Sequence, residues 1–257
     1  MTAAVSGNGD AALATALQVS ARRERARNFV EREGRTKLPL RLDPAGAVFV
    51  VFRPTGSAPM APARSIVATL PIDGPWELRF QPGRGAPDRV TLAHLISWPE
   101  HAEAGVRFFS GTATYTRDVH VPPEQVGAGQ TLELDLGEVR NLAEVTLNGA
   151  AVGVAWKRPY RIDLTSAVRA GANALEIKVT NLWPNRLIGD DHRPPDCEWL
   201  DTRLKRWPDW LQAGEPSPTG RVTFSTRRHW KKTDALLPSG LLGPVRVVVS
   251  REGAGQP

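Results

Sequence analysis

The stretch TLELDLG, residues 131–137, alternates apolar and acidic side chains with a period of two. Its three leucines therefore share one face of an extended strand, and its two acids share the opposite face. This pattern is typical of an antiparallel sheet that packs one face on a core and leaves the other in water. The stretch therefore predicts a half-buried β-strand.

The same alternation recurs along the chain on both sides of this strand. AEVTLNG, residues 143–149, ends in Asn-Gly, which favours a two-residue hairpin turn because both central residues need positive φ. ALEIKVTN, residues 174–181, turns its apolar residues to one side. Further strands are predicted at 47–52, 76–80, 112–121, 160–164 and 245–250. Short alternating strands without a strand–helix–strand repeat predict an all-β protein with an antiparallel jelly-roll or β-sandwich fold.

The character of the sequence divides the chain into four parts. Residues 1–37 are rich in Ala and then in Arg and Glu, and Leu13 and Leu17 are spaced as on one helical face, so we predict a helical or disordered leader. Residues 38–75 hold a strand and a Pro/Ser/Ala-rich loop, which we interpret as the remnant of a preceding β domain. The antiparallel jelly roll is predicted at 76–251, with a tail at 252–257.

Composition excludes several classes of partner. The chain has 257 residues, a net charge of +6 and one cysteine, so it can form neither an internal disulfide nor a thiolate metal cluster. Cys197 lies between Asp196 and Glu198, whose charges are expected to raise its pKa and keep the thiol inert. The basic stretches lack a nucleic-acid-binding motif, and no apolar run could span a bilayer, so we expect no nucleic acid and no membrane partner. We find no signal peptide and leave the localisation open.

The acidic residues do not form an evident catalytic pair. Glycoside hydrolysis needs two carboxylates that face each other across the scissile bond. Glu133, Asp135, Glu144 and Glu176 all fall on the strand faces opposite the apolar residues, so we interpret them as a solvated surface. No nucleophile elbow and no glycine-rich phosphate loop is present. The sequence therefore predicts no catalytic residue.

Asp190, Asp191 and His192 form the strongest candidate metal ligands. Neighbouring residues rarely converge on one metal, and there is no second His at helical spacing. A calcium ion held by the two Asp carboxylates and backbone carbonyls is the alternative. We expect neither a metal nor an organic cofactor.

The segment VTNLWPNRLIGDD, residues 179–191, allows two interpretations. In the first, it is a structural corner in which Trp183 plugs the end of the sandwich and Arg186 pairs with Asp190 or Asp191. In the second, it belongs to a sugar-facing surface, because an indole offers a flat apolar face and a guanidinium donates to hydroxyls or to a uronic carboxylate. The candidate residues for that surface are Trp156, Tyr160, Asn181, Trp183, Asn185 and Arg186.

Several phrases of the sequence resemble a known family. FFSGTATYTRDVHVP (108–122), the Asn-Gly hairpin, YRIDLT (160–165) and Gly-x-Asn before a strand resemble the sugar-binding jelly roll of β-galactosidase-like glycoside hydrolases. The flanks are similar to the C-terminal region of α-L-rhamnosidases of glycoside hydrolase family 106. These flanks are PLRLDPAGAVFVVFR (39–53), NLWPNRLIGDD (181–191), GRVTFSTRRHW (220–230) and LLPSGLLGPVRV (236–247).

The resemblance implies a role without catalysis. In that family the catalytic carboxylates lie in a large barrel that precedes this region, so no residue here inherits them. The resemblance implies an accessory domain, a fragment that lacks the barrel, with the parent enzyme's catalytic barrel and a rhamnose-containing glycan as partners. Enzymes of this family are often exported in bacteria. A free-standing carbohydrate-binding module is the alternative, and an autonomous glycosidase is a third possibility. Whether the chain alone is an enzyme stays open, although we expect it to be inactive.

Overall fold

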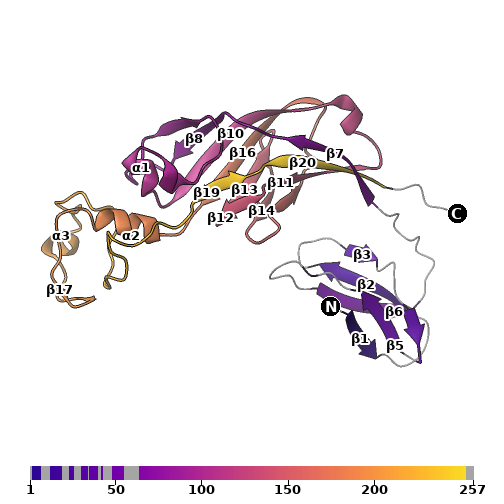
Figure 1. Cartoon of the computed structure of the whole chain (residues 1–257), viewed down its shortest axis with the longest axis horizontal. Coiled ribbons are helices and arrows are strands. Elements are labelled where there is room, and N and C mark those ends of the chain that lie inside the picture. Colours follow the sequence, from indigo (N-terminus) through magenta and orange to yellow (C-terminus); the bar gives the residue numbers. More distant parts are fainter. Residues whose placement is uncertain are drawn as a thin grey trace. The chain divides into compact units, whose positions relative to one another are not determined.

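The chain divides into two compact units, Met1–Ile66 with Ser250–Pro257, and Val67–Val249 (Figure 1). The computed structural model describes residues 2–6, 12–18, 23–25, 30–33, 35–39, 42, 48–54 and 64–252. In this described part, no helix is long and apolar enough to cross a membrane.

The first unit contains two antiparallel three-stranded sheets. One has the order β1-β5-β4, from β1 (Thr2–Ser6), β5 (Arg35–Pro39) and β4 (Val30–Arg32). The other has the order β3-β2-β6, from β3 (Arg23–Arg25), β2 (Ala12–Gln18) and β6 (Val48–Pro54). The strand predicted at 47–52 is therefore confirmed as β6.

The described parts of residues 1–37 are mainly strands, where we predicted a helical or disordered leader. Leu13 and Leu17, which suggested the helix, lie in β2, opposite Arg53 and Phe49 of β6. The prediction of a helix is wrong for this strand because residues four apart share a face in a strand as well as in a helix. Pairing with the β-branched and aromatic residues of β6 selects the extended form, which no local spacing could reveal.

The second unit is an antiparallel β-sandwich, as the alternating strands predicted. The larger sheet has the order β14 (Ala150–Ala155), β13 (Leu142–Leu147), β16 (Gly171–Thr180), β10 (Thr112–Val121), β8 (Trp76–Phe80) and β9 (Arg89–Leu92). The smaller sheet has the order β15 (Arg161–Asp163), β11 (Gln130–Asp135), β20 (Arg246–Glu252) and β7 (Arg64–Pro71). A further pair joins β12 (Glu138–Arg140) to β19 (Gly240–Gly243).

The inward side chains of both sheets form one apolar core. Trp76, Leu78 and Phe80 alternate with exposed residues along β8, and Leu134 of β11 is fully buried. Complete burial of one such aliphatic side chain stabilises the fold by about 1.5–3 kcal/mol. The core also holds the Tyr115 hydroxyl, which accepts hydrogen bonds from Trp98 Nε1 at 2.7 Å and from Leu241 N at 3.0 Å. Burial raises the pKa of Tyr115.

Strand β7 lies within the segment that we predicted as a loop before residue 76. It is the edge strand of the smaller sheet, and its residues Ile66 and Val67 are 68% and 46% exposed. After it, Ile72 N donates to Val245 O at 2.9 Å. An edge strand with exposed aliphatic residues carries no clean alternation, so period-two analysis does not detect it.

Asp135 corrects the prediction of a solvated acidic face. Glu144 is exposed and Glu133 and Glu176 are partly buried, but Asp135 is buried at the end of β11. Its carboxylate lies 3.3 Å from Arg161 Nη2 and 3.0 Å from Arg246 Nη2, side chains of the two neighbouring strands. The alternation placed Asp135 on the face opposite the leucines, but it could not show which arginines cover it.

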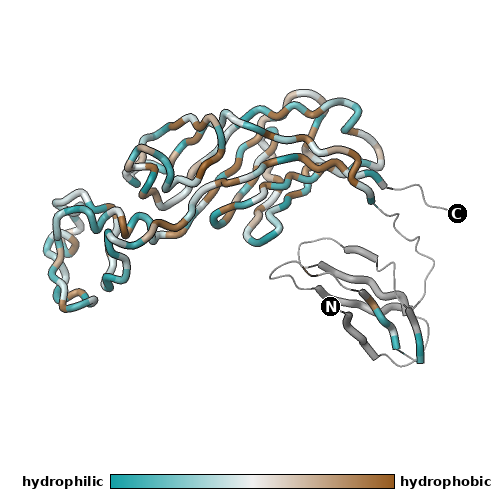
Figure 2. Tube along the Cα trace, viewed as in Figure 1, coloured by the Kyte–Doolittle hydropathy of each residue, from teal (hydrophilic) through white to brown (hydrophobic). Residues whose placement is uncertain are grey.

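Short helices and an arm complete this unit. The helices are η1 (Trp98–Glu100), α1 (Ala104–Arg107), η2 (Pro123–Gln125) and α2 (Pro184–Asp190). Residues 191–238, which we call the arm, follow α2 and hold β17 (Trp199–Leu200), β18 (Arg203–Leu204) and α3 (Asp209–Gln212). Figure 1 shows the arm projecting from the sandwich beyond α2. Its tube is mainly hydrophilic in Figure 2, so the arm has little apolar core of its own.

Candidate functional site

Asn181 connects the end of β16 to neighbouring loops. Its Nδ2 donates to Phe109 O at 2.9 Å and to Ser239 Oγ at 3.2 Å. Its Oδ1 accepts a hydrogen bond from Gly111 N at 2.9 Å. Because Asn181 is buried and its amide nitrogen and oxygen both make internal hydrogen bonds, it holds the corner together.

Asn185, in the first turn of α2, connects this helix to the C-terminal end of the arm. Its Nδ2 donates to Leu237 O at 2.7 Å and to Ser239 Oγ at 2.9 Å, and its Oδ1 accepts from Leu237 N at 2.8 Å. The amide thus imitates a backbone partner for residue 237. Asn185 is also buried, so its contacts are internal.

Arg186 and Asp190 form a buried ion pair one turn apart on α2. Arg186 Nη2 lies 3.0 Å from Asp190 Oδ1, and their side chains are 6% and 0% exposed. Burial lowers the pKa of Arg186, and the charge of Asp190 opposes this shift. The first interpretation of the corner predicted this pairing, and the structure confirms the pairing.

Asp190 also anchors the arm. Its Oδ2 accepts hydrogen bonds from Val222 N at 3.1 Å, Thr223 N at 2.7 Å and Thr223 Oγ1 at 2.6 Å. All three donors belong to two adjacent residues of the arm. One buried side chain therefore links α2 to a segment of the arm more than 30 residues away in the sequence.

Trp183 does not plug the end of the sandwich, which corrects the other half of that interpretation. Its side chain is 45% exposed, and the guanidinium carbon of Arg84 lies 4.8 Å from the ring centroid. Trp183 directly precedes Pro184, where α2 begins, and this turn directs the indole outward. The buried aromatic positions are filled instead by residues such as Trp98 and Phe109.

The remaining two candidates lie on the connection from β14 to β15. Trp156 is 64% exposed, whereas Tyr160 is partly buried and packs against the core. The six predicted residues thus lie in two places: Trp156 and Tyr160 between β14 and β15, and the other four from the end of β16 into the first turn of α2. Asn181, Asn185 and Arg186 make internal contacts, and Trp156 and Trp183 present indole faces to solvent.

Asp191 and Asp196 are occupied within the arm. Asp191 Oδ1 lies 2.8 Å from Arg228 Nη2, and Asp196 Oδ1 accepts from Arg221 Nε at 2.9 Å. Burial alone would raise the pKa of Asp196, but the Ser217 hydroxyl and Arg221 lower the pKa overall. Among the described residues, no group of three His, Cys, Asp or Glu side chains is placed to bind a metal ion.

Cys197 has the poor reactivity that its neighbours predicted. Burial and the adjacent Asp196 carboxylate raise the pKa of the Cys197 thiol to about 11. The thiolate, which is the nucleophilic form, is therefore scarce at neutral pH.

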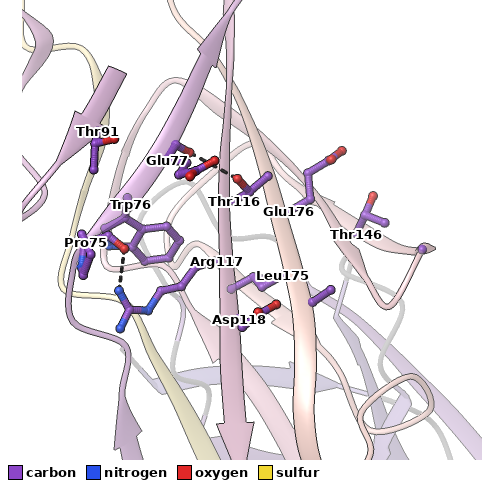
Figure 3. Close-up of a pocket in the computed structure, with 12 residues that line it drawn as sticks. Pro75, Trp76, Glu77, Thr91, Thr116, Arg117, Asp118, Thr146, Leu175 and Glu176 are labelled. Carbon is purple, nitrogen blue, oxygen red and sulfur yellow. Dashed lines mark hydrogen bonds between the residues drawn. The ribbon is translucent and has the colours of Figure 1, made fainter. Parts of the chain in front are cut away.

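A hollow on the outer face of the larger sheet did not emerge from the sequence. Its volume is about 530 Å³, and it is lined by polar and apolar residues of β8, β9, β10, β13 and β16 (Figure 3). In the sequence, its polar residues are typical of the solvent-facing positions of amphipathic strands. Only the pairing of the strands brings them together.

Comparison with known proteins agrees with this architecture. Residues 100–210 match the family model described as glycosyl hydrolase 2 galactose-binding domain-like. A putative β-glucuronidase of Formosa agariphila is 42% identical over 195 residues, which are 76% of this chain and 17% of that protein. The structure of a rhamnosidase from Novosphingobium sp. PP1Y matches 95% of this chain and 21% of its own, with a TM-score of 0.74 and 36% identity.

These findings define the class of domain. The chain carries a galactose-binding-like β-sandwich of the kind found in glycoside hydrolases, similar to parts of a rhamnosidase and of a putative β-glucuronidase. It spans about a fifth of the length of either relative. The resemblance to a sugar-binding domain of glycoside hydrolases is thus confirmed, while the assignment to the C-terminal region of family 106 stays a prediction.

Proposed function

We propose that the chain is a non-catalytic accessory domain of an α-L-rhamnosidase-type glycoside hydrolase of family 106. The observation that carries the proposal is the similarity to the rhamnosidase, which extends over 95% of this chain and only 21% of that enzyme. In this role the domain packs on the catalytic barrel of the parent enzyme and helps to wall its substrate cleft.

The environment of the buried carboxylates supports a role without catalysis. A glycosidase needs one carboxylic acid whose raised pKa lets it protonate the leaving group, with a second carboxylate across the bond. Asp135 and Asp196 are instead paired with arginines, and their pKa values are lowered. Asp190 is engaged by Arg186 and three donors of the arm. These acids are suited to holding the fold rather than to donating a proton.

Hydrolysis assays of the purified chain test this proposal. We expect no release of nitrophenol above buffer from aryl α-L-rhamnosides or aryl β-D-glucuronides. A robust rate that disappears when one carboxylate is replaced by its amide, with the fold intact by circular dichroism, would refute the proposal.

A second candidate function, a free-standing carbohydrate-binding module for rhamnose-containing glycans, is favoured by the two exposed indoles. Trp156 and Trp183 are 64% and 45% exposed, and Arg84 supports the ring of Trp183 from one side. An indole fixed in this way offers its apolar face to the C–H groups of a sugar.

Titration of rhamnose-containing oligosaccharides tests this second function. Trp183→Ala and Trp156→Ala are compared with Trp207→Ala, a matched control because Trp207 is also exposed but stacks on Phe224 of the arm at 5.5 Å. Weaker binding in the first two variants and not in the control supports the function. Absence of heat and of a fluorescence change at millimolar sugar counts against it.

A further inference from the structure

Five polar side chains form one continuous row across the larger sheet. The register pairs Thr146 with Glu176, Glu176 with Thr116, Thr116 with Glu77, and Glu77 with Thr91. These residues come from five neighbouring strands, and Figure 3 shows their side chains side by side. Since strands lie about 4.8 Å apart, the row spans roughly 19 Å.

The row crosses a hollow because the adjoining positions carry small side chains. Ala174, Gly149 and Pro75 belong to the lining on one side of the row, and the exposed carboxylate of Asp118 lies there too. The volume of about 530 Å³ falls within the range of roughly 300–1,000 Å³ that is usual for small-molecule sites. A long side chain at Ala174 would fill much of this space.

The polar groups of the row are accessible to a ligand. Glu176 lies 3.4 Å from Lys178, and Glu77 lies 3.9 Å from Arg89; both are loose, solvent-exposed pairs that contribute little to stability. The Thr116 hydroxyl donates only a long bond, 3.5 Å, to Glu77 O. Hydroxyls that both donate and accept, next to carboxylates that accept, match the vicinal hydroxyls of a sugar.

One wall of the hollow is held in place by Arg117. Its Nη1 donates to Pro75 O at 2.6 Å, and its guanidinium carbon lies 5.8 Å from the ring centroid of Trp76. The Trp76 ring itself is fully buried and lies on the core face of β8, opposite Glu77 of the row.

We propose that this hollow binds a neutral, hydroxyl-rich saccharide through the Thr/Glu row. The proposal rests on the carbohydrate-binding function proposed above, and it places the sugar on the outer face of the larger sheet rather than at Trp156 or Trp183. Three carboxylates and one guanidinium line the hollow, so it should prefer a neutral sugar to a uronate.

The test is a calorimetric and NMR titration of the full chain with methyl α-L-rhamnoside and with a neutral rhamno-oligosaccharide. Ala174→Tyr should weaken binding at least tenfold by filling the hollow, and Glu176→Gln should weaken it several-fold by removing a charged acceptor. Glu144→Gln is the matched control, since Glu144 is an exposed acid of the same sheet outside the lining, and it should bind as the wild type does. An otherwise similar oligosaccharide that carries a glucuronate should bind more weakly.

The outcomes separate this inference from the function on which it rests. If Trp183→Ala abolishes binding while both hollow variants bind normally, the site on the sheet is wrong and the carbohydrate-binding function survives. If the wild type binds none of these sugars, both fail. Equal or tighter binding of the glucuronate overturns the preference for a neutral ligand. If thermal melting shows that Ala174→Tyr is misfolded, Glu176→Gln alone decides whether the sugar binds in the hollow.

Discussion

At the scale of single residues, buried charges hold the corner between the sandwich and the arm. Asp190 is fully buried and receives Arg186 from its own helix and three donors from the arm. An ionised carboxylate is tolerated in the interior only when its neighbours replace the lost hydration. The pair should therefore matter most when one partner is removed.

Replacement of Arg186 by Ala should destabilise the sandwich unit strongly. Breaking a buried ion pair on one side costs about 3–5 kcal/mol, because the other charge stays buried without compensation. We expect a fall in melting temperature of roughly 10 °C by calorimetry. Arg206→Ala, which removes a solvent-exposed partner of Glu198, is the control and should melt close to the wild type. An unchanged melt for Arg186→Ala would contradict the structural role.

Asp135 should make stability depend on pH in the acidic range. Burial raises its pKa, but the Gly137 N–H, Arg246 and Arg161 together lower it below the ordinary value. The folded state thus prefers the ionised form, so this contribution is present above the unfolded pKa of about 3.9 and is lost as pH falls through the folded pKa. Chemical denaturation from pH 7 to pH 2.5 should show that the free energy of unfolding falls at acidic pH. In Asp135→Asn this free energy should fall less steeply with pH. An identical slope in the variant would argue against it.

At the scale of elements, the hairpin between β13 and β14 shows how a local sequence sets strand pairing. Asn148 and Gly149 have φ of 52° and 81°, as a two-residue turn of this type requires. The Asn148 side chain adds bonds to Ala167 O and to Asn173 Oδ1 at 3.0 and 2.9 Å. The turn therefore sets the pairs next to it, Leu147 with Ala150 and Thr146 with Ala151, before the register shifts at Val145.

Gly149→Ala should lower the free energy of unfolding by about 1–2 kcal/mol, the cost of a left-handed conformation for a residue with a Cβ. A Cβ at this position would meet no atom within 4 Å, so the effect is conformational and not steric. Gly127→Ala is the control, because a Cβ there meets only an ordinary contact and its φ is not left-handed. Urea titration of both variants measures the difference; equal midpoints would count against this explanation.

At the scale of the whole sandwich unit, the arm depends on α2 for its place. Asp191 and Asp196 of the arm pair with arginines of the arm itself. Asp190 of α2 instead links the helix to Val222 and Thr223 of the arm. The arm has few regular strands, so this link should control its opening.

Asp190→Asn should increase amide hydrogen exchange in the arm and leave the sandwich strands protected. The amide keeps the shape of the side chain but is a weaker hydrogen-bond acceptor for Thr223 N. It also leaves the buried charge of Arg186 without the opposite charge of Asp190. Asp234→Asn is the control, since Asp234 accepts only the local bond from Lys231 N among the described hydrogen bonds. Exchange mapped by mass spectrometry should rise around residue 223 in the first variant only. A uniform rise over the sandwich would instead indicate global destabilisation.

The sequence by itself determined the class of fold and several local features. Period-two alternation predicted most strands of the sandwich but not β7 or β9, and Asn148-Gly149 predicted the hairpin, because both signals depend only on neighbouring residues. The pairing of Arg186 with an Asp a few residues away was accessible for the same reason. The neighbouring acids predicted the direction of the pKa shift of Cys197, although burial is its largest cause and only Asp196 of the two acids contributes.

Only the tertiary structure decided which of these residues meet. The burial of Asp135 depends on Arg161 and Arg246, which come from two other strands. The exposure of Trp183 follows from where α2 starts, and the Thr/Glu row joins residues from 77 to 176 through strand order. Alternation tells which way a side chain points, but hydrogen bonding between distant strands selects its neighbours. A surface made of several strands is therefore a property of the sheet and not of any stretch of sequence.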